Sequence, residues 1–246
     1  MTAKLETARL IVVTDAAELA QRAADEIALE IAVKPDLSLL AATGNTPMGA
    51  YAELGRRQLE GRLGTSRLRV AQLDEYLGVG DDDPRSLYRW LETSLTGPLG
   101  VTNERLVRFA GNAADPVADC AAFDAAIAAW GGIDLAVLGL GPNGHLGFNE
   151  PPSSADAPTR VVTLTPASLL SNAGYWGGLA VPNRAVTAGM KLILSAKRVL
   201  LLVSGAHKQE ILRRALNEPV TPDLPASLLR RTALTVIADR AAWDAS

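Results

Sequence analysis

The chain has 246 residues, of which 48% are hydrophobic, and a formal net charge of -3. This composition can bury a full core without disulfides, and the small net charge gives no support for nucleic-acid binding. Two histidines and a single cysteine leave little for a zinc site. Neither a secretory signal pattern nor a membrane-spanning apolar run is present, so we expect a soluble cytoplasmic protein with no membrane partner.

Short apolar runs alternate with helical patterns along the chain. The runs predict strands, and the patterns between them predict helices that follow Asp15 and the turn at 43–47. This alternation favours the α/β class, with one domain over 1–246 and an open, mostly parallel sheet covered by helices on both faces. Strands are expected at 10–13, 37–41, 68–73, 105–109, 133–138, 161–164, 199–203 and 234–237, and later helices at 116–130 and 208–216.

The glycine-rich segment 139–151 is the most informative part of the sequence. Three glycines precede His145, and Glu150 stands five residues after it. Because the segment follows the apolar run 133–138, it stands just beyond a predicted strand, where open α/β sheets bind their ligands. A histidine and a glutamate at that place indicate a catalytic acid–base pair.

The turn Thr43-Gly44-Asn45-Thr46-Pro47 joins a predicted strand to a predicted helix. Its small residues let the backbone approach a ligand, and the start of the helix offers free N–H groups to a phosphate. Taken alone, the turn fits an ordinary strand-to-helix connection equally well. It matches neither the P-loop nor the dinucleotide fingerprint, which lowers the case for ATP or NAD.

Two adjacent carboxylates, Asp74 and Glu75, follow the predicted strand 68–73. Adjacent side chains cannot both point into one pocket. We therefore expect one carboxylate to belong to a functional site and the other to support it. An aspartate there could act as a general base with its pKa tuned by burial. Without its context, the pattern favours a helix N-cap or a solvated loop acid.

Lys208 opens a predicted helix after the strand 199–203. A lysine in a first helical turn opposes the helix dipole, and an anionic ligand beside it would explain its place. Its neighbour His207 is expected to be an exposed residue rather than a catalyst.

Together these segments resemble the family of glucosamine-6-phosphate deaminases. The motifs are Thr-Gly-x-Thr-Pro at 43–47, Leu-Asp-Glu-Tyr at 73–76 and Gly-x-Gly-x-x-Gly-His-x-x-Phe-Asn-Glu-Pro at 139–151, and the match extends through 182–189 and 204–208. The resemblance implies a Rossmann-like fold shared with the 6-phosphogluconolactonases. It also implies chemistry without a metal or an organic cofactor.

The resemblance implies a role for each candidate residue. Asp74 would be the general base that moves a proton between C2 and C1 of a small phosphorylated amino sugar, and His145 would open the ring. Glu150 would orient His145. The residues Thr43, Gly44, Asn45, Thr46 and Lys208 would hold the phosphate. The products would be a ketose 6-phosphate and ammonia.

The chain departs from the family pattern at two places. Asn143 stands where the family has an aspartate, so we expect His145 to stay neutral over a wider pH range. Gly174 stands where the glucosamine enzymes carry a phosphate-binding arginine, and Arg184 is one candidate for replacing that contact. Both departures are found in a branch that resembles galactosamine-6-phosphate deaminase/isomerase, which tilts the expected substrate toward galactosamine 6-phosphate.

Two other hypotheses stay open at this point. A sugar-phosphate lactonase is suggested by Gly141-Pro142 before the Gly-His pair, and a non-catalytic sugar-phosphate sensor is suggested by Asn143. The sequence does not fix the oligomeric state, and a homo-oligomer is one option.

Overall fold

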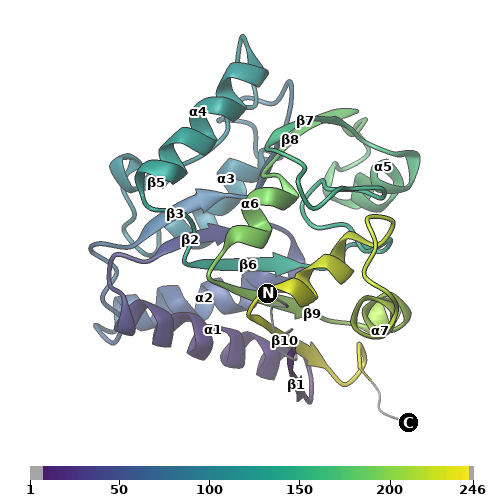
Figure 1. Cartoon of the computed structure of the whole chain (residues 1–246). Helices are drawn as coiled ribbons and strands as arrows, with labels where there is room; N and C mark the ends of the chain where they lie inside the picture. Colours follow the sequence, from purple (N-terminus) through teal and green to yellow (C-terminus); the bar gives the residue numbers. More distant parts are fainter. Residues whose placement is uncertain (1–7, 244–246) are drawn as a thin grey trace, which may run out of the picture.

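A seven-stranded parallel sheet forms the centre of the described structure (Figure 1). The structure is a computed structural model, and it describes residues 8–243. The strand order is β1-β10-β9-β6-β2-β3-β5, and all neighbouring strands run parallel. These strands are β1 (Arg9–Val13), β2 (Ser38–Ala41), β3 (Arg69–Gln72), β5 (Leu106–Val107), β6 (Leu135–Gly139), β9 (Arg198–Val203) and β10 (Leu234–Asp239).

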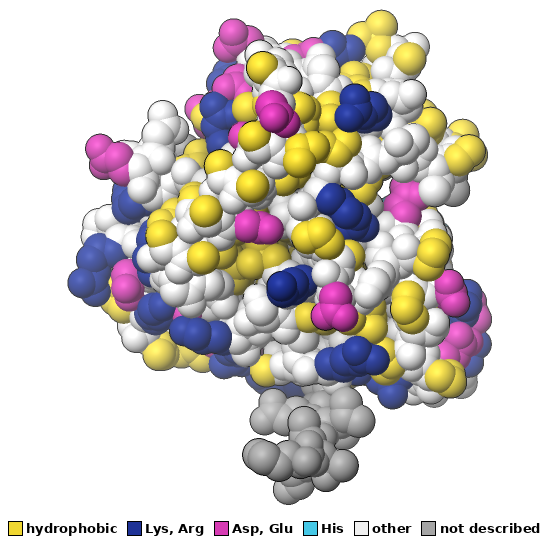
Figure 2. Space-filling model, turned by 45° about the horizontal axis from the view of Figure 1, so that its top comes forward, with side chains coloured by type: hydrophobic (Ala, Val, Ile, Leu, Met, Phe, Trp, Pro, Cys, Tyr) yellow, Lys and Arg dark blue, Asp and Glu magenta, His cyan; other side chains and the backbone are white. Residues whose placement is uncertain are grey.

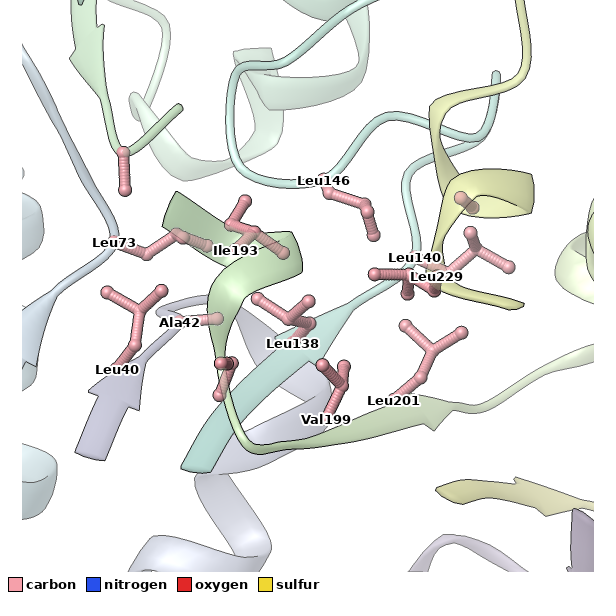
Figure 3. Close-up of a cluster of buried hydrophobic side chains, with 14 of the residues drawn as sticks. Leu40, Ala42, Leu73, Leu138, Leu140, Leu146, Ile193, Val199, Leu201 and Leu229 are labelled. Carbon is pink, nitrogen blue, oxygen red and sulfur yellow. The ribbon is translucent and has the colours of Figure 1, made fainter. Parts of the chain in front are cut away.

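Helices cover both faces of this sheet, as the sequence predicted. Successive residues of a strand point to opposite faces, so Leu39 packs in one apolar cluster and Leu40 in the other. The cluster of Leu39 includes α1 (Ala16–Val33) and α2 (Asn45–Leu59). The cluster of Leu40, shown in part in Figure 3, includes α4 (Pro116–Ala129), α6 (Met190–Ser195), α7 (Gln209–Asn217) and the 3₁₀ segment Pro225–Arg231.

The direction of the strand order reverses between β2 and β6. From β2 the chain moves outward to β3 and β5, and then returns to β6 on the other side of β2. Ligands of open α/β sheets bind at such a switch point, beyond the carboxyl ends of the strands. The turn at 43–47 follows β2 and the glycine-rich segment follows β6, so the fold brings these two motifs to the switch point.

A second, three-stranded antiparallel sheet stands beside the main one. It has the order β4-β8-β7, with β4 (Asp74–Tyr76), β8 (Arg184–Thr187) and β7 (Arg160–Thr163). The strand expected at 161–164 therefore exists, but it does not join the parallel sheet. Strands β4 and β8 were not predicted, because runs of three or four residues are too short for periodicity to separate them from loops.

Four shorter helical segments were also not expected from the sequence. Helix α3 (Leu87–Leu91) continues into a π-helical segment (Glu92–Thr96), and α5 (Pro166–Asn172) precedes a 3₁₀ turn (Ala173–Tyr175). On the face shown in Figure 2, acidic and basic side chains are interspersed rather than gathered in a basic block. Over residues 8–243, no helix is long and apolar enough to span a bilayer.

Candidate active site

A pocket of about 1160 Å³ lies at the carboxyl ends of the central strands. Most of the residues predicted for a site line it, and they come from four different strand ends. Asn143 and Glu150 belong to the segment after β6 but are not among the lining residues. The predicted residues that line the pocket are Thr43, Gly44, Asn45, Thr46, Asp74, His145 and Lys208.

The start of α2 presents backbone N–H groups beside the pocket. Gly44 precedes the helix with a φ of 112°, a value that favours glycine, and no side chain caps the helix. Uncapped N–H groups together with the positive end of the helix dipole suit an anion such as phosphate.

Asp74 and Glu75 occupy neighbouring positions of β4 with different surroundings. The Asp74 side chain lines the pocket, and burial together with the charge of Glu75 raises its pKa to about 8. Glu75 faces away, where its carboxylate accepts hydrogen bonds from Ser86 Oγ at 2.8 Å and from the backbone N–H groups of Leu87 and Tyr88 at 3.0 and 2.7 Å. One carboxylate thus faces the pocket while the other anchors the start of α3.

His145 packs tightly against its own loop. The Gly141 N–H donates to the His145 carbonyl at 3.0 Å, and a Cβ at residue 141 would lie 2.2 Å from the imidazole Nε2. Burial lowers the pKa of His145 to about 4, and the charge of Lys208 contributes in the same direction while that of Glu150 opposes it. Its Nδ1 atom is buried and has no hydrogen-bond partner among the described residues. The side chain is therefore neutral at ordinary pH.

The two remaining residues of the motif do not contact the imidazole through a hydrogen bond in the described structure. Asn143 Oδ1 accepts from the backbone N–H of His145 at 3.2 Å, so the amide supports the loop rather than the ring. The Glu150 carboxylate accepts from the backbone N–H of Thr165 at 3.3 Å. That Glu150 orients His145 stays a prediction.

Lys208 brings a positive charge to the pocket. Within residues 8–243 its ammonium makes no ion pair or hydrogen bond, and burial lowers its pKa. The turn before it is fixed by Asp239, whose carboxylate accepts from Ser204 Oγ and from the Gly205 N–H. His207 is exposed at the rim, as the sequence predicted.

One wall of the pocket was not predicted from the sequence. Arg85, Arg89 and Trp90, from the start of α3, line it together with Trp176. The only local signal was the Pro84-Arg85-Ser86 turn, where Ser86 Oγ caps α3 by accepting from the Arg89 N–H at 3.2 Å. No local pattern in that turn indicates that its side chains line a pocket together with Asp74.

Gly174 stands where the glucosamine enzymes are expected to carry an arginine, and Arg184 was the candidate to replace it. Neither residue places a cation in the pocket. Gly174 is exposed, and a Cβ there would meet no atom within 4 Å. Arg184 is exposed at the start of β8 and does not line the pocket. Within the described part of the chain, no group of histidine, cysteine and carboxylate side chains is arranged to hold a metal ion.

The sequence matches the family described as Glucosamine-6-phosphate isomerases/6-phosphogluconolactonase over residues 14–238. The chain belongs to this family. A glucosamine-6-phosphate deaminase of Clostridium acetobutylicum is 35% identical, with 95% of this chain and 98% of that protein covered. One of Streptomyces coelicolor is 37% identical over 95% of this chain and 90% of its own length.

Solved structures of the family share this fold. A monomeric glucosamine-6-phosphate deaminase superposes with a TM-score of 0.91 at 37% identity, covering 95% of this chain and 98% of its own. A 6-phosphogluconolactonase from Trypanosoma cruzi has a TM-score of 0.78 at 22% identity, covering 98% of this chain and 97% of its own, and indicates the fold alone. The Rossmann-like α/β fold predicted from the motifs is confirmed.

Proposed function

We propose that the protein is an amino-sugar phosphate deaminase that converts a hexosamine 6-phosphate into a ketose 6-phosphate and ammonia. The observation that carries this proposal is the pocket that combines a buried carboxylate, a neutral imidazole and an unpaired ammonium, from Asp74, His145 and Lys208. The relatives named glucosamine-6-phosphate deaminase support it.

The phosphate is held by the start of α2 and by Lys208. Four residues, Thr43 to Thr46, surround the free N–H groups, and the ammonium adds the charge that a dianion requires. A phosphate fixed there orients the sugar, so that binding energy from a remote group positions C1 and C2 at the acid–base residues.

Ring opening uses His145. A neutral imidazole accepts the proton of the anomeric hydroxyl and delivers a proton to the ring oxygen, which breaks the bond between C1 and that oxygen and frees the aldehyde. Its pKa of about 4 keeps the imidazole neutral and able to accept a proton at physiological pH. Glu150 is proposed to stabilise the imidazolium that forms for a moment.

The isomerisation uses Asp74. Its carboxylate removes the proton from C2 while O1 takes up a proton lost by the substrate ammonium, which gives a neutral enolamine. Asp74 then returns its proton to C1, which leaves a protonated imine at C2. Water adds to that imine, and ammonia departs to leave the ketone. The ammonium of the bound substrate favours the charged carboxylate, so binding lowers the pKa of Asp74 from about 8 toward the range of a working base.

The choice of epimer is a separate proposal. The curated relatives are named for glucosamine 6-phosphate, which makes it the first substrate to test. Asn143 and Gly174 resemble the galactosamine-type branch, and on that ground we propose galactosamine 6-phosphate as a substrate as well. The two epimers differ at C4, so they give fructose 6-phosphate and tagatose 6-phosphate respectively.

A single assay tests the activity against its alternatives. The protein is incubated with each hexosamine 6-phosphate and with 6-phosphogluconolactone, while ammonia, ketose phosphate and lactone are measured. We expect ammonia and ketose phosphate in equal amounts from at least one amino sugar, and none from an Asp74→Asn variant. Lactone loss without ammonia would favour the lactonase suggested by Gly141-Pro142. Binding without turnover of any of the three would favour a sensor.

We also propose a cytoplasmic location for the protein, and a homo-oligomer as one option for its assembly state. A relative with this fold is described as monomeric, and that description concerns that protein. Size-exclusion chromatography with light scattering would measure the state of this chain directly.

A further inference from the structure

The described residues that line the pocket include two arginines that no step of the proposed reaction uses. Arg85 and Arg89 lie on the wall formed by the start of α3. The helical segment after α3 packs against α2, and Thr93 of that segment lines the same pocket as Thr46 and Pro47. This wall therefore adjoins the helix start that is proposed to hold the phosphate.

Arg85 is held in one orientation by two contacts. Its backbone N–H and its Nε both donate to Asp83 Oδ1, at 2.9 and 2.7 Å, and its Nη2 donates to the other oxygen of the same carboxylate. The guanidinium carbon lies 4.8 Å from the centre of the Trp176 ring. Because the guanidinium is hydrogen-bonded along one edge and stacked on one face, the side chain has few accessible rotamers. It therefore loses little conformational entropy when it binds an anion.

The opposite edge of this guanidinium is open. Arg85 Nη1 makes no hydrogen bond within residues 8–243, and the side chain is 30% exposed. Arginine carries five donors in a plane, and the carboxylate of Asp83 occupies only one edge of the fork. The remaining N–H groups are therefore available to a ligand in the pocket.

The Trp176 ring on which Arg85 stacks belongs to a packed aromatic cluster. Trp176 is 4% exposed and meets the Tyr76 ring edge to face at 5.1 Å, and Tyr76 lies two residues after Asp74 in β4. Tyr76 in turn packs on Phe148 of the glycine-rich segment at 5.2 Å. Arg85 thus rests on packed aromatic rings rather than on a solvated loop.

We propose that Arg85 is a phosphate-contacting residue, which donates from its open edge to the anion held by the start of α2 and by Lys208. The inference rests on the proposed function and names a further residue of its binding site. The chemistry recognised is a phosphate monoester, and free phosphate shares it. Planar N–H pairs suit phosphate oxygens, and charge-assisted bonds of this kind are stronger than neutral ones.

Arg108 offers a matched control. It also combines an aspartate and an aromatic ring, outside the pocket: its Nη1 and Nη2 donate to Asp81 at 3.0 and 2.6 Å, and its guanidinium lies 4.0 Å from the Tyr88 ring centre. Its side chain is 29% exposed, against 30% for Arg85. Arg108→Gln therefore removes an equivalent charge, ion pair and stacking contact without touching the proposed anion.

The test compares Arg85→Gln, Arg85→Lys and Arg108→Gln in the full-length protein. Titration calorimetry measures inorganic phosphate binding, and steady-state kinetics measure KM and kcat for the hexosamine 6-phosphate. For Arg85→Gln we expect phosphate affinity to fall about tenfold to 100-fold and KM to rise by a similar factor. We expect kcat to change far less, Arg85→Lys to recover part of the loss, and Arg108→Gln to bind phosphate like the wild type.

Two results would overturn the proposal. One is an unchanged phosphate affinity in Arg85→Gln, even if KM rises, because the arginine would then contact the sugar or act on the fold alone. The other is an equal loss in Arg108→Gln. Since phosphate binding is measured without turnover, a wild-type protein that releases no ammonia would refute the proposed function and leave this test intact.

Discussion

The imidazole of His145 packs on the backbone of Gly141, and a Cβ at residue 141 would lie 2.2 Å from both Cδ2 and Nε2 of the ring. The same two residues close their loop through the hydrogen bond from Gly141 N–H to the His145 carbonyl. The position of the ring thus depends on the absence of a side chain four residues earlier. Steric contact with the ring of His145, the catalytic candidate, therefore explains why the motif has a glycine at residue 141.

Gly141→Ala is expected to move the ring out of place and to lower kcat/KM about 100-fold, the size of effect that a displacement of about 1 Å can have. The loss should fall mainly on kcat, because the residues proposed to hold the phosphate stay in place. Gly64→Ala is the control, since a Cβ there meets no atom within 4 Å. Wild-type activity in Gly141→Ala would mean that ring opening does not need this position of His145.

Asp74→Asn is expected to stabilise the fold at neutral and alkaline pH while it abolishes deamination. The folded protein raises the pKa of Asp74 from 3.8 to about 8, so between those values the folded state holds a proton that the unfolded chain has released. By linkage, the wild-type free energy of unfolding falls as pH rises through this window. Asparagine removes that dependence.

Urea unfolding at pH 4 and pH 9 measures the difference. At pH 9 the variant should exceed the wild type by at least about 1.4 kcal/mol, the free energy of one pKa unit, and near pH 4 the gap should close. A gap that is the same at both pH values would show that the carboxyl of Asp74 titrates normally in the folded protein.

The parallel sheet and the strand-end motifs could be predicted from the sequence because each is a local signal. A strand buried on both faces is an unbroken apolar run, such as 199–203, and the residues after it fall at the edge where ligands bind. Asp74, His145 and Lys208 were placed in this way. Parallel strands then brought the three ends together without any further information from the chain.

The rest of the site depends on contacts that no local pattern encodes. Arg85 directly precedes the start of α3, which Glu75, on a three-residue strand, anchors through buried hydrogen bonds. The sequence places Asn143 two residues before His145, but it does not reveal that the amide oxygen accepts from the backbone N–H of His145 rather than contacting the ring. Arg184 matched by sequence position, yet β8 leaves it exposed and away from the pocket.

We expect kcat/KM to rise with pH, with a midpoint near pH 8, because Asp74 of the free enzyme must be ionised to act as a base. The negative charge of Glu75 is one cause of this raised pKa. Glu75→Gln should therefore move the acid limb of the kcat/KM profile to lower pH.

The same Glu75→Gln change should cost about 1–3 kcal/mol of stability, since an amide N–H₂ would face the buried donors at the start of α3. Glu210→Gln, on an exposed carboxylate that pairs with Arg213, serves as the control for both measurements. An acid limb that stays near pH 8 in Glu75→Gln would assign the raised pKa of Asp74 to burial alone.

Asn143→Asp is expected to raise the pKa of His145 from about 4 by about one unit or more, because it adds a negative charge beside the ring's own backbone. An aspartate can accept the same hydrogen bond from the His145 N–H, so the turn should persist. The chain has two histidines, and a His207→Gln background leaves the imidazole of His145 alone in a proton NMR titration.

Stability provides a second measurement of the same shift. The folded wild type holds the pKa of His145 at about 4 instead of 6.5, so the stability due to its neutral form is complete above pH 6.5 and is lost as pH falls toward 4. In Asn143→Asp the charged imidazole is better tolerated, and the loss between pH 7 and pH 5 should be smaller. If neither the NMR titration nor the unfolding curves change, the amide at residue 143 does not help to keep His145 neutral, and that part of the argument for a galactosamine-type site would fail with it.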